Sequence, residues 1–126
     1  MGVSDYRASY EGGSRAMEEL ARFLNAMAVR HPQIADVIDL ELVEKTFASR
    51  RATAAKNKAA LPTATVFTKR KIERLRAGYD GAMMSYESAT EMVRHLANQQ
   101  GRIVTSNLIE LLTASAGDLQ VAAEAT

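Results

Sequence analysis

Apolar residues recur at intervals of three and four along most of this chain. Met17, Leu20, Leu24 and Met27 show the pattern near its start. Because an α-helix has about 3.6 residues per turn, this spacing places all four side chains on one helix face. The same spacing continues over 34–47, 72–86, 89–96 and 108–112. It predicts an all-α fold, a small antiparallel helical bundle of about four to five helices.

Single residues predict where the first helices begin and end. Ser14 fits an N-cap, because its hydroxyl can accept a hydrogen bond from the free amides of a first turn. Residues 1–13 are then expected to form a flexible N-terminal arm. The first helix should end at His31, since a residue before proline is disfavoured in the α conformation. Pro32 suits the first turn of a second helix.

The middle of the chain leaves two interpretations open. Residues 48–63 are rich in alanine, lysine and arginine, so they either extend the second helix into solvent or form a linker. In both cases residues 14–126 form a single helical domain. Gly78 and Gly81 fall inside the third helix, which begins near Thr65. Each glycine costs about 1 kcal/mol relative to alanine, so we expect a kink or tight packing there.

Composition excludes several classes of protein. The chain has 126 residues and no cysteine, which removes disulfides, thiolate nucleophiles and cysteine-based metal sites. The first ten residues are polar and mixed, unlike a signal peptide. Uninterrupted apolar runs are far shorter than the roughly 20 residues that a membrane span needs. We therefore expect a cytoplasmic protein that does not enter a membrane.

Positive charge is concentrated in one central stretch. Residues 1–49 contain five basic and eight acidic residues, and residues 77–126 contain two basic and six acidic ones. Residues 50–76 contain nine basic residues against one acidic residue, Glu73. Asymmetry of this kind indicates binding partners rather than a particular fold. The nine candidate binding residues are Arg50, Arg51, Lys56, Lys58, Lys69, Arg70, Lys71, Arg74 and Arg76.

Clustered lysine and arginine side chains attract a phosphate backbone, because binding releases its condensed counterions. Arg70 and Arg74 lie one helical turn apart, so several charges can face one direction. The pattern therefore predicts non-enzymatic binding of a nucleic-acid backbone, either RNA or single-stranded DNA, without base reading. Two other interpretations stay open. The stretch could dock an acidic protein partner or a second copy of the chain, or it could be a solvated face that balances acidic neighbours.

Other residue patterns have structural explanations. Phe67 and Tyr79 bracket the basic residues of the third helix and could stack on unpaired bases, but their helical spacing favours the core. Glu91 and His95 lie four residues apart, whereas a di-iron bundle needs glutamate and histidine three apart in two copies. No phosphate-binding loop, nucleophile elbow or catalytic triad motif occurs. We expect no enzyme activity, metal, cofactor or small-molecule substrate.

Residues 91–112 resemble the first two helices of a winged helix-turn-helix. Gly101 reads as the residue that ends one helix, and a short strand-like link, 102–105, precedes the next helix. A recognition helix would then lie near 115–125. That segment has two acidic residues and no lysine or arginine, unlike helices that read DNA. A helix-turn-helix transcriptional regulator is therefore a further alternative.

A cysteine-free helical bundle of this length with one basic face resembles the small subunits of CRISPR effector complexes. In that family several copies line a ribonucleoprotein filament and hold guide RNA or target strand by its backbone, without catalysis. The resemblance implies that this chain is a small subunit of a larger ribonucleoprotein complex. It covers size, helix content and the placement of basic residues, and no sequence motif. The residues concerned are Arg50, Arg51, Lys69, Arg70, Lys71, Arg74 and Arg76.

Overall fold

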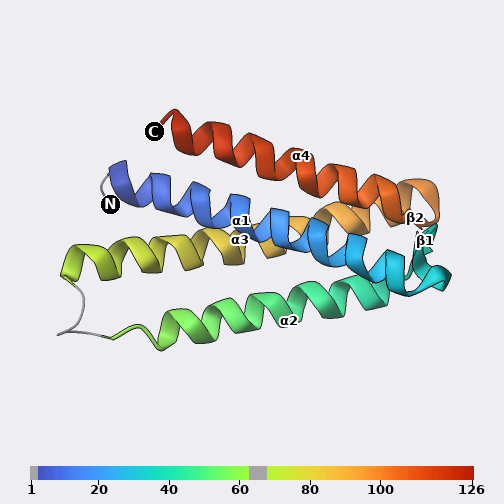
Figure 1. The fold of residues 1–126 in the computed structure, drawn as a ribbon, viewed down its shortest axis with the longest axis horizontal. Helices are drawn as coiled ribbons and strands as arrows, with labels where there is room; N and C mark the ends of the chain where they lie inside the picture. The colour runs from blue at the N-terminus through green and yellow to red at the C-terminus, as the bar shows by residue number, and fades with distance from the viewer. Residues whose placement is uncertain (1–2, 63–67) are drawn as a thin grey trace.

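Four long helices make up nearly all of the described chain. The structure is a computed structural model that describes the backbone of residues 3–62 and 68–126, and the side chains from residue 5 over the same ranges. Consecutive helices run in opposite directions (Figure 1), so the predicted small antiparallel all-α bundle is confirmed. The helices are α1 (Val3–Arg30), α2 (Leu40–Ala59), α3 (Lys69–Gln100) and α4 (Thr105–Glu124).

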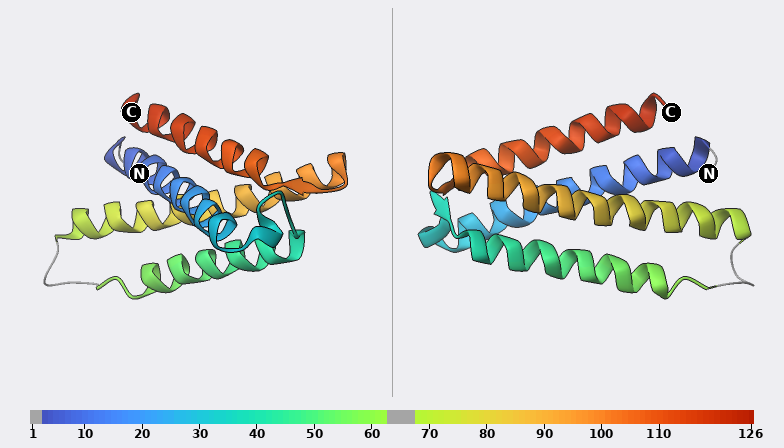
Figure 2. Two further views of the ribbon diagram at one scale, coloured as in Figure 1. Left: turned by 45° about the vertical axis from the view of Figure 1, so that its right-hand side comes forward. Right: turned by 180° about the vertical axis from the view of Figure 1, so that it is seen from behind.

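The helices pack on one another in the order α4, α1, α3, α2. The two central helices, α1 and α3, run in the same direction side by side (Figure 1). The start of α1, the end of α2, the start of α3 and the end of α4 lie together at one end of the molecule (Figures 1 and 2). We call this the hairpin end, because α2 and α3 form a helical hairpin there.

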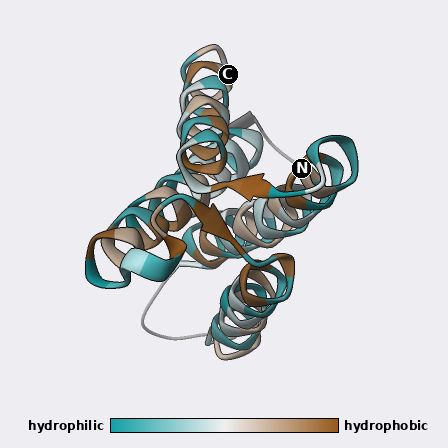
Figure 3. Cartoon of the chain, turned by 90° about the vertical axis from the view of Figure 1, so that its right-hand side faces the viewer, coloured by the Kyte–Doolittle hydropathy of each residue, from teal (hydrophilic) through white to brown (hydrophobic). Residues whose placement is uncertain are grey.

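The opposite end of the molecule is closed by two short strands. β1 (Val37–Ile38) pairs antiparallel with β2 (Ile103–Val104), and both are coloured as hydrophobic in Figure 3. The Thr105 hydroxyl donates a hydrogen bond to the Ile34 carbonyl at 2.7 Å, which links the strand pair to the short turn before β1. The strand predicted within 102–105 is therefore confirmed. Its partner, β1, was not predicted from the sequence.

The hydrophobic core joins all four helices and the strand pair. The apolar stripe predicted at the start of the chain is buried, with Leu20 fully enclosed and Met17 and Leu24 at 2% exposure. Fully enclosed side chains from the other helices meet it, namely Val43, Phe47, Val93, Leu108 and Leu112. Burial of this apolar surface supplies the main driving force for folding.

Helix α1 starts much earlier than the sequence predicted. Residues 3–13 are helical rather than a flexible arm, and Ser14 lies inside α1 instead of capping it. The Ser14 side chain is buried and donates to the Ala116 carbonyl of α4 at 2.8 Å. Tertiary packing explains the difference, because residues 9–13 contact α3, and packing overrides the low helix propensity of glycine.

Glycines let α1 and α3 approach backbone to backbone. A Cβ atom on Gly12 would lie 2.8 Å from the Gly78 carbonyl carbon, and one on Gly81 would lie 2.7 Å from the Ser9 carbonyl carbon. Real Cβ atoms do not approach backbone carbons so closely, so only glycine fits at Gly12 and Gly81. Of the two outcomes expected for Gly78 and Gly81, the structure shows tight packing within a continuous α3.

The segment between α1 and α2 also differs from the prediction. Helix α1 ends at Arg30, as the following His31-Pro32 pair indicated. Pro32 does not open a long helix, because residues 32–34 form one 3-10 turn, β1 follows, and α2 begins only at Leu40. Val37 and Ile38, which were predicted to be helical, instead form a strand that pairs with β2.

Three further helix boundaries can be compared with the sequence predictions. Residues 48–59 belong to α2, so the helical interpretation holds for that part of 48–63. Helix α3 begins at Lys69, and the predicted start near Thr65 lies outside the described residues. Gly101 ends α3 with a φ of 72°, which confirms the predicted glycine stop.

Candidate nucleic-acid interface

The α2–α3 hairpin brings the two halves of the basic stretch to one end of the molecule. Residues 50–58 occupy the second half of α2, and residues 69–76 occupy the first two turns of α3. Because the two helices are antiparallel neighbours, both segments lie toward the hairpin end (Figure 1). The basic residues are thus collected in space as well as in sequence.

Two of the predicted binding residues hold the hairpin together. Arg51 Nε lies 2.5 Å from Glu87 Oε1, and Lys58 Nζ lies 2.6 Å from Asp80 Oδ1. Both ion pairs connect α2 to α3. All four side chains are about a third or more exposed, so each pair contributes at most about 1 kcal/mol of stability. Arg51 and Lys58 therefore have a structural role that the sequence alone did not indicate.

Other cations at the hairpin end have no carboxylate partner among the described residues. Lys56, Lys69, Arg74 and Arg76 are exposed and make no ion pair within residues 5–62 and 68–126. Their charges are therefore available to a ligand in solution.

The helix dipole favours the basic residues at the end of α2 but not those at the start of α3. Lys56 and Lys58 lie in the last turn of α2, where the helix dipole favours cations. The first turn of α3 contains Lys69, Arg70 and Lys71 and no acidic residue. There the dipole disfavours each cation by about 0.3–1 kcal/mol. The helix dipole therefore does not explain these three residues, and an anionic ligand would offset the unfavourable interaction.

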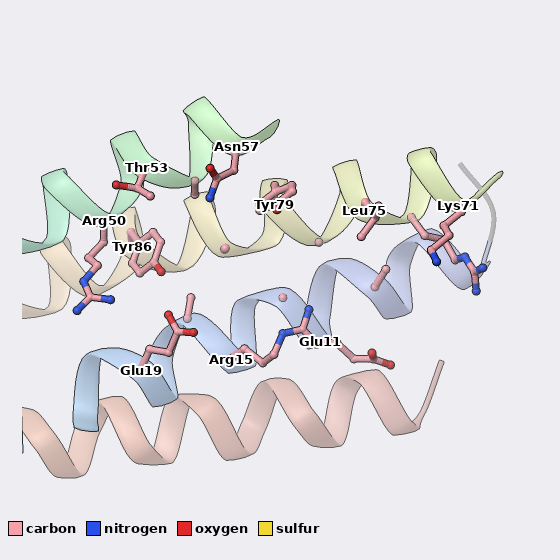
Figure 4. Close-up of a pocket in the computed structure, with 17 residues that line it drawn as sticks. Glu11, Arg15, Glu19, Arg50, Thr53, Asn57, Lys71, Leu75, Tyr79 and Tyr86 are labelled. Carbon is pink, nitrogen blue, oxygen red and sulfur yellow. The ribbon is translucent and has the colours of Figure 1, made fainter. Parts of the chain in front are cut away.

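A groove runs between α1 and α2, with α3 as its floor. Its volume is about 660 Å³ (Figure 4). We call it the basic groove, because four cations from three helices line it: Arg15 of α1, Arg50 of α2, and Lys71 and Arg74 of α3. Arg15 was not predicted from the sequence, because it lies in the acidic first part of the chain. The small residues that make up much of its lining, Ala8, Gly12, Ala54, Gly78 and Ala82, keep the groove open.

The far end of the basic groove holds a cluster of polar groups around Tyr86. Burial raises the pKa of the Tyr86 phenol, the nearby Glu19 carboxylate raises it further, and Arg50 opposes both effects. The Arg50 guanidinium also lies 4.9 Å from the centre of the Phe23 ring. This cation–π contact holds Arg50 at the edge of the groove without neutralising its charge.

The remaining candidates from the sequence have clear positions. Tyr79 is half-buried on the floor of the basic groove and packs partly against the core. Phe67 lies outside the described residues. Helix α4 is continuous over 105–124, so residues 115–125 do not form the separate recognition helix that the helix-turn-helix likeness required.

Neither a metal-ligand cluster nor a membrane-spanning helix occurs among the described residues. Within residues 5–62 and 68–126, no three His, Asp or Glu side chains come close enough together to hold a metal ion. No helix in the described part of the chain is both long enough and apolar enough to cross a membrane.

Comparison with known proteins identifies no relative. No protein-family model, curated protein or solved structure matches the chain. The resemblance to CRISPR small subunits therefore stays a prediction.

Proposed function

We propose that this protein binds the sugar-phosphate backbone of a nucleic acid through the hairpin end, without catalysis, as a small helical subunit of a larger ribonucleoprotein complex. One observation carries the proposal: the fold gathers cations from both arms of the hairpin, and several of them have no carboxylate partner in the described part of the chain. Affinity would come from counterion release, which depends on charge and not on base sequence.

The position of these charges supports a ligand role. Lys69 stands at the positive end of α3, where it lowers helix stability. Lys56 and Arg76 are exposed on the two arms of the same hairpin. A polyanion lying across the hairpin end would neutralise all three charges.

Charge reversal at these three positions tests the proposal. In the variant Lys56→Glu, Lys69→Glu, Arg76→Glu, we expect more than tenfold weaker binding of an oligonucleotide at low salt, because three phosphate contacts become repulsive. Fluorescence anisotropy with labelled dT20 and U20 measures the affinity. Circular dichroism at 222 nm checks that the helices are retained.

A matched variant separates local charge from net charge. The substitutions Arg30→Glu, Lys45→Glu and Arg102→Glu change the net charge equally. These exposed residues lie at the end of α1, in the second turn of α2 and directly before β2, and so toward the end of the molecule that the two strands close. We expect this variant to keep most of the wild-type affinity. Equal losses in the two variants would remove the hairpin end as the binding surface, and no binding by the wild-type protein would end the proposal.

A further inference from the structure

The basic groove has the length and charge placement of a track for an extended anion. Along α3 its lining runs from Lys71 to Tyr86, a distance of about 22 Å at 1.5 Å per residue. Lys71 lies toward the hairpin end, Arg15 lies near the middle, and Arg50 lies at the far end (Figure 4). Arg74 also lines the groove and follows Lys71 on α3 by about one turn. Cations are therefore distributed along the groove and are not gathered at one point.

The acidic residues of the groove only partly offset these cations. Glu11 is held by Arg7, whose Nε lies 2.9 Å from Glu11 Oε1, so its charge is already compensated. Glu19 is the other acidic residue in the lining, and it lies beside Tyr86 and Arg50. The groove lining therefore contains more cationic than anionic side chains.

The floor of the groove offers apolar and aromatic surface between the charges. Tyr79 is half-buried there, and Leu75 lies one turn away on the same helix. Cations on both walls and at one end of the floor, with apolar surface between them, suit a ligand that carries both phosphates and flat bases. A purely ionic partner would leave the floor unused.

From these features we infer that the basic groove holds a single-stranded segment of nucleic acid, with its phosphates on Arg15, Arg50 and Arg74 and its bases over the α3 floor. The inference rests on the proposed function and narrows the ligand from nucleic acid in general to single strands. A duplex is convex and buries its bases in the stack, so it can contact the outer cations of the hairpin but cannot enter a concave groove between two helices. The groove therefore selects single strands over duplexes.

Substitution of Arg15 tests the charge contact. Arg15→Gln should weaken binding of dT20 at least fivefold and change binding of a 20-base-pair duplex less than twofold. Arg22→Gln is the matched control, because Arg22 is an exposed arginine on the same helix outside the groove lining. Arg22→Gln should leave both affinities within twofold of wild type. Glu19→Gln should tighten single-strand binding, since it removes a negative charge from the lining.

Filling the groove tests the location independently of charge. Asn57 lines the α2 wall and is exposed, so tryptophan there would occupy the space without disturbing the core (Figure 4). Asn57→Trp should reduce dT20 binding at least tenfold and leave duplex binding unchanged. Ala52→Trp is the control, because Ala52 is exposed on α2 away from the groove lining.

The outcomes distinguish the inference from the proposal on which it rests. If Asn57→Trp and Arg15→Gln bind dT20 like wild type, strands lie outside the groove, and the inference is overturned while the proposed function stands. If dT20 and duplex bind equally well and are equally sensitive to Arg15→Gln, the claimed selectivity is wrong. If polyglutamate displaces dT20 at lower concentration than unlabelled dT20 does, the groove belongs to an acidic protein segment, and the inference also fails.

Discussion

The close crossing of α1 and α3 predicts that Gly81→Ala destabilises the protein. Helix propensity alone would make alanine about 1 kcal/mol more stable than glycine inside a helix. The added Cβ would lie 2.7 Å from the Ser9 carbonyl carbon and closer still to its oxygen, so the two backbones must separate by on the order of 1 Å. Overpacking of a close contact costs about 1–3 kcal/mol, and a backbone clash belongs at the upper end. The net expectation is a loss of about 2 kcal/mol.

Gly78→Ala provides a matched control on the same helix. A Cβ atom there would meet its nearest neighbours at 3.7 and 3.9 Å, which is ordinary van der Waals contact. This variant should therefore gain the helix propensity of alanine, about 1 kcal/mol. Thermal unfolding followed by circular dichroism should show Tm lowered by roughly 8 °C for Gly81→Ala and raised by roughly 4 °C for Gly78→Ala. A Gly81→Ala protein as stable as Gly78→Ala would refute the close crossing.

Two further predictions concern buried polar groups. Ser14→Ala should lower the free energy of unfolding by about 1 kcal/mol in urea titrations, because it removes the buried hydrogen bond to the Ala116 carbonyl; an unchanged midpoint would mean that α1 and α4 do not meet there. The pKa of the Tyr86 phenol is raised above the ordinary tyrosine value of 10.0, chiefly by burial, so the folded state favours the neutral phenol. Its contribution to stability is intact below about pH 10 and is lost as the pH rises through the raised pKa. Between about pH 9 and pH 11, wild type should therefore lose more stability than Tyr86→Phe, and equal losses would contradict the burial of this phenol.

Periodicity predicted the elements that rest on local sequence. The spacing of Met17, Leu20 and Leu24 indicated the buried face of α1, and Gly101 indicated the end of α3. Both follow from helix geometry and from the left-handed conformation that glycine adopts easily. These features need no knowledge of distant contacts.

Long-range contacts explain what the sequence did not predict. Gly12 and Gly13 indicated a flexible arm because glycine weakens an isolated helix, yet both are buried on α3. Val37 and Ile38 fitted a helical stripe, but they pair with a strand that lies more than sixty residues later in the chain. No local pattern encodes either contact.

The candidate site was likewise predicted from the sequence only in part. The basic residues within 50–76 could be counted in the sequence. Which of them are ion-paired and which are available to a ligand depends on where the fold places the carboxylates of α3. Arg15 was missed because it is a single arginine among acidic neighbours, and only the packing of α1 on α3 brings it to the groove. Small residues at Gly12 and Gly78 were the one sequence signal of that close crossing.

The salt dependence of oligonucleotide binding tests the central claim most directly. Six cations that line the basic groove or the outer hairpin end make no carboxylate ion pair in the described chain: Arg15, Arg50, Lys56, Lys69, Arg74 and Arg76. At about 0.7 counterions per phosphate contact on a single strand, a plot of log K against log salt should have a slope of about −4. Affinity for dT20 should then fall roughly 250-fold between about 50 and 200 mM salt. A slope between zero and about −1 would contradict binding through the phosphate backbone.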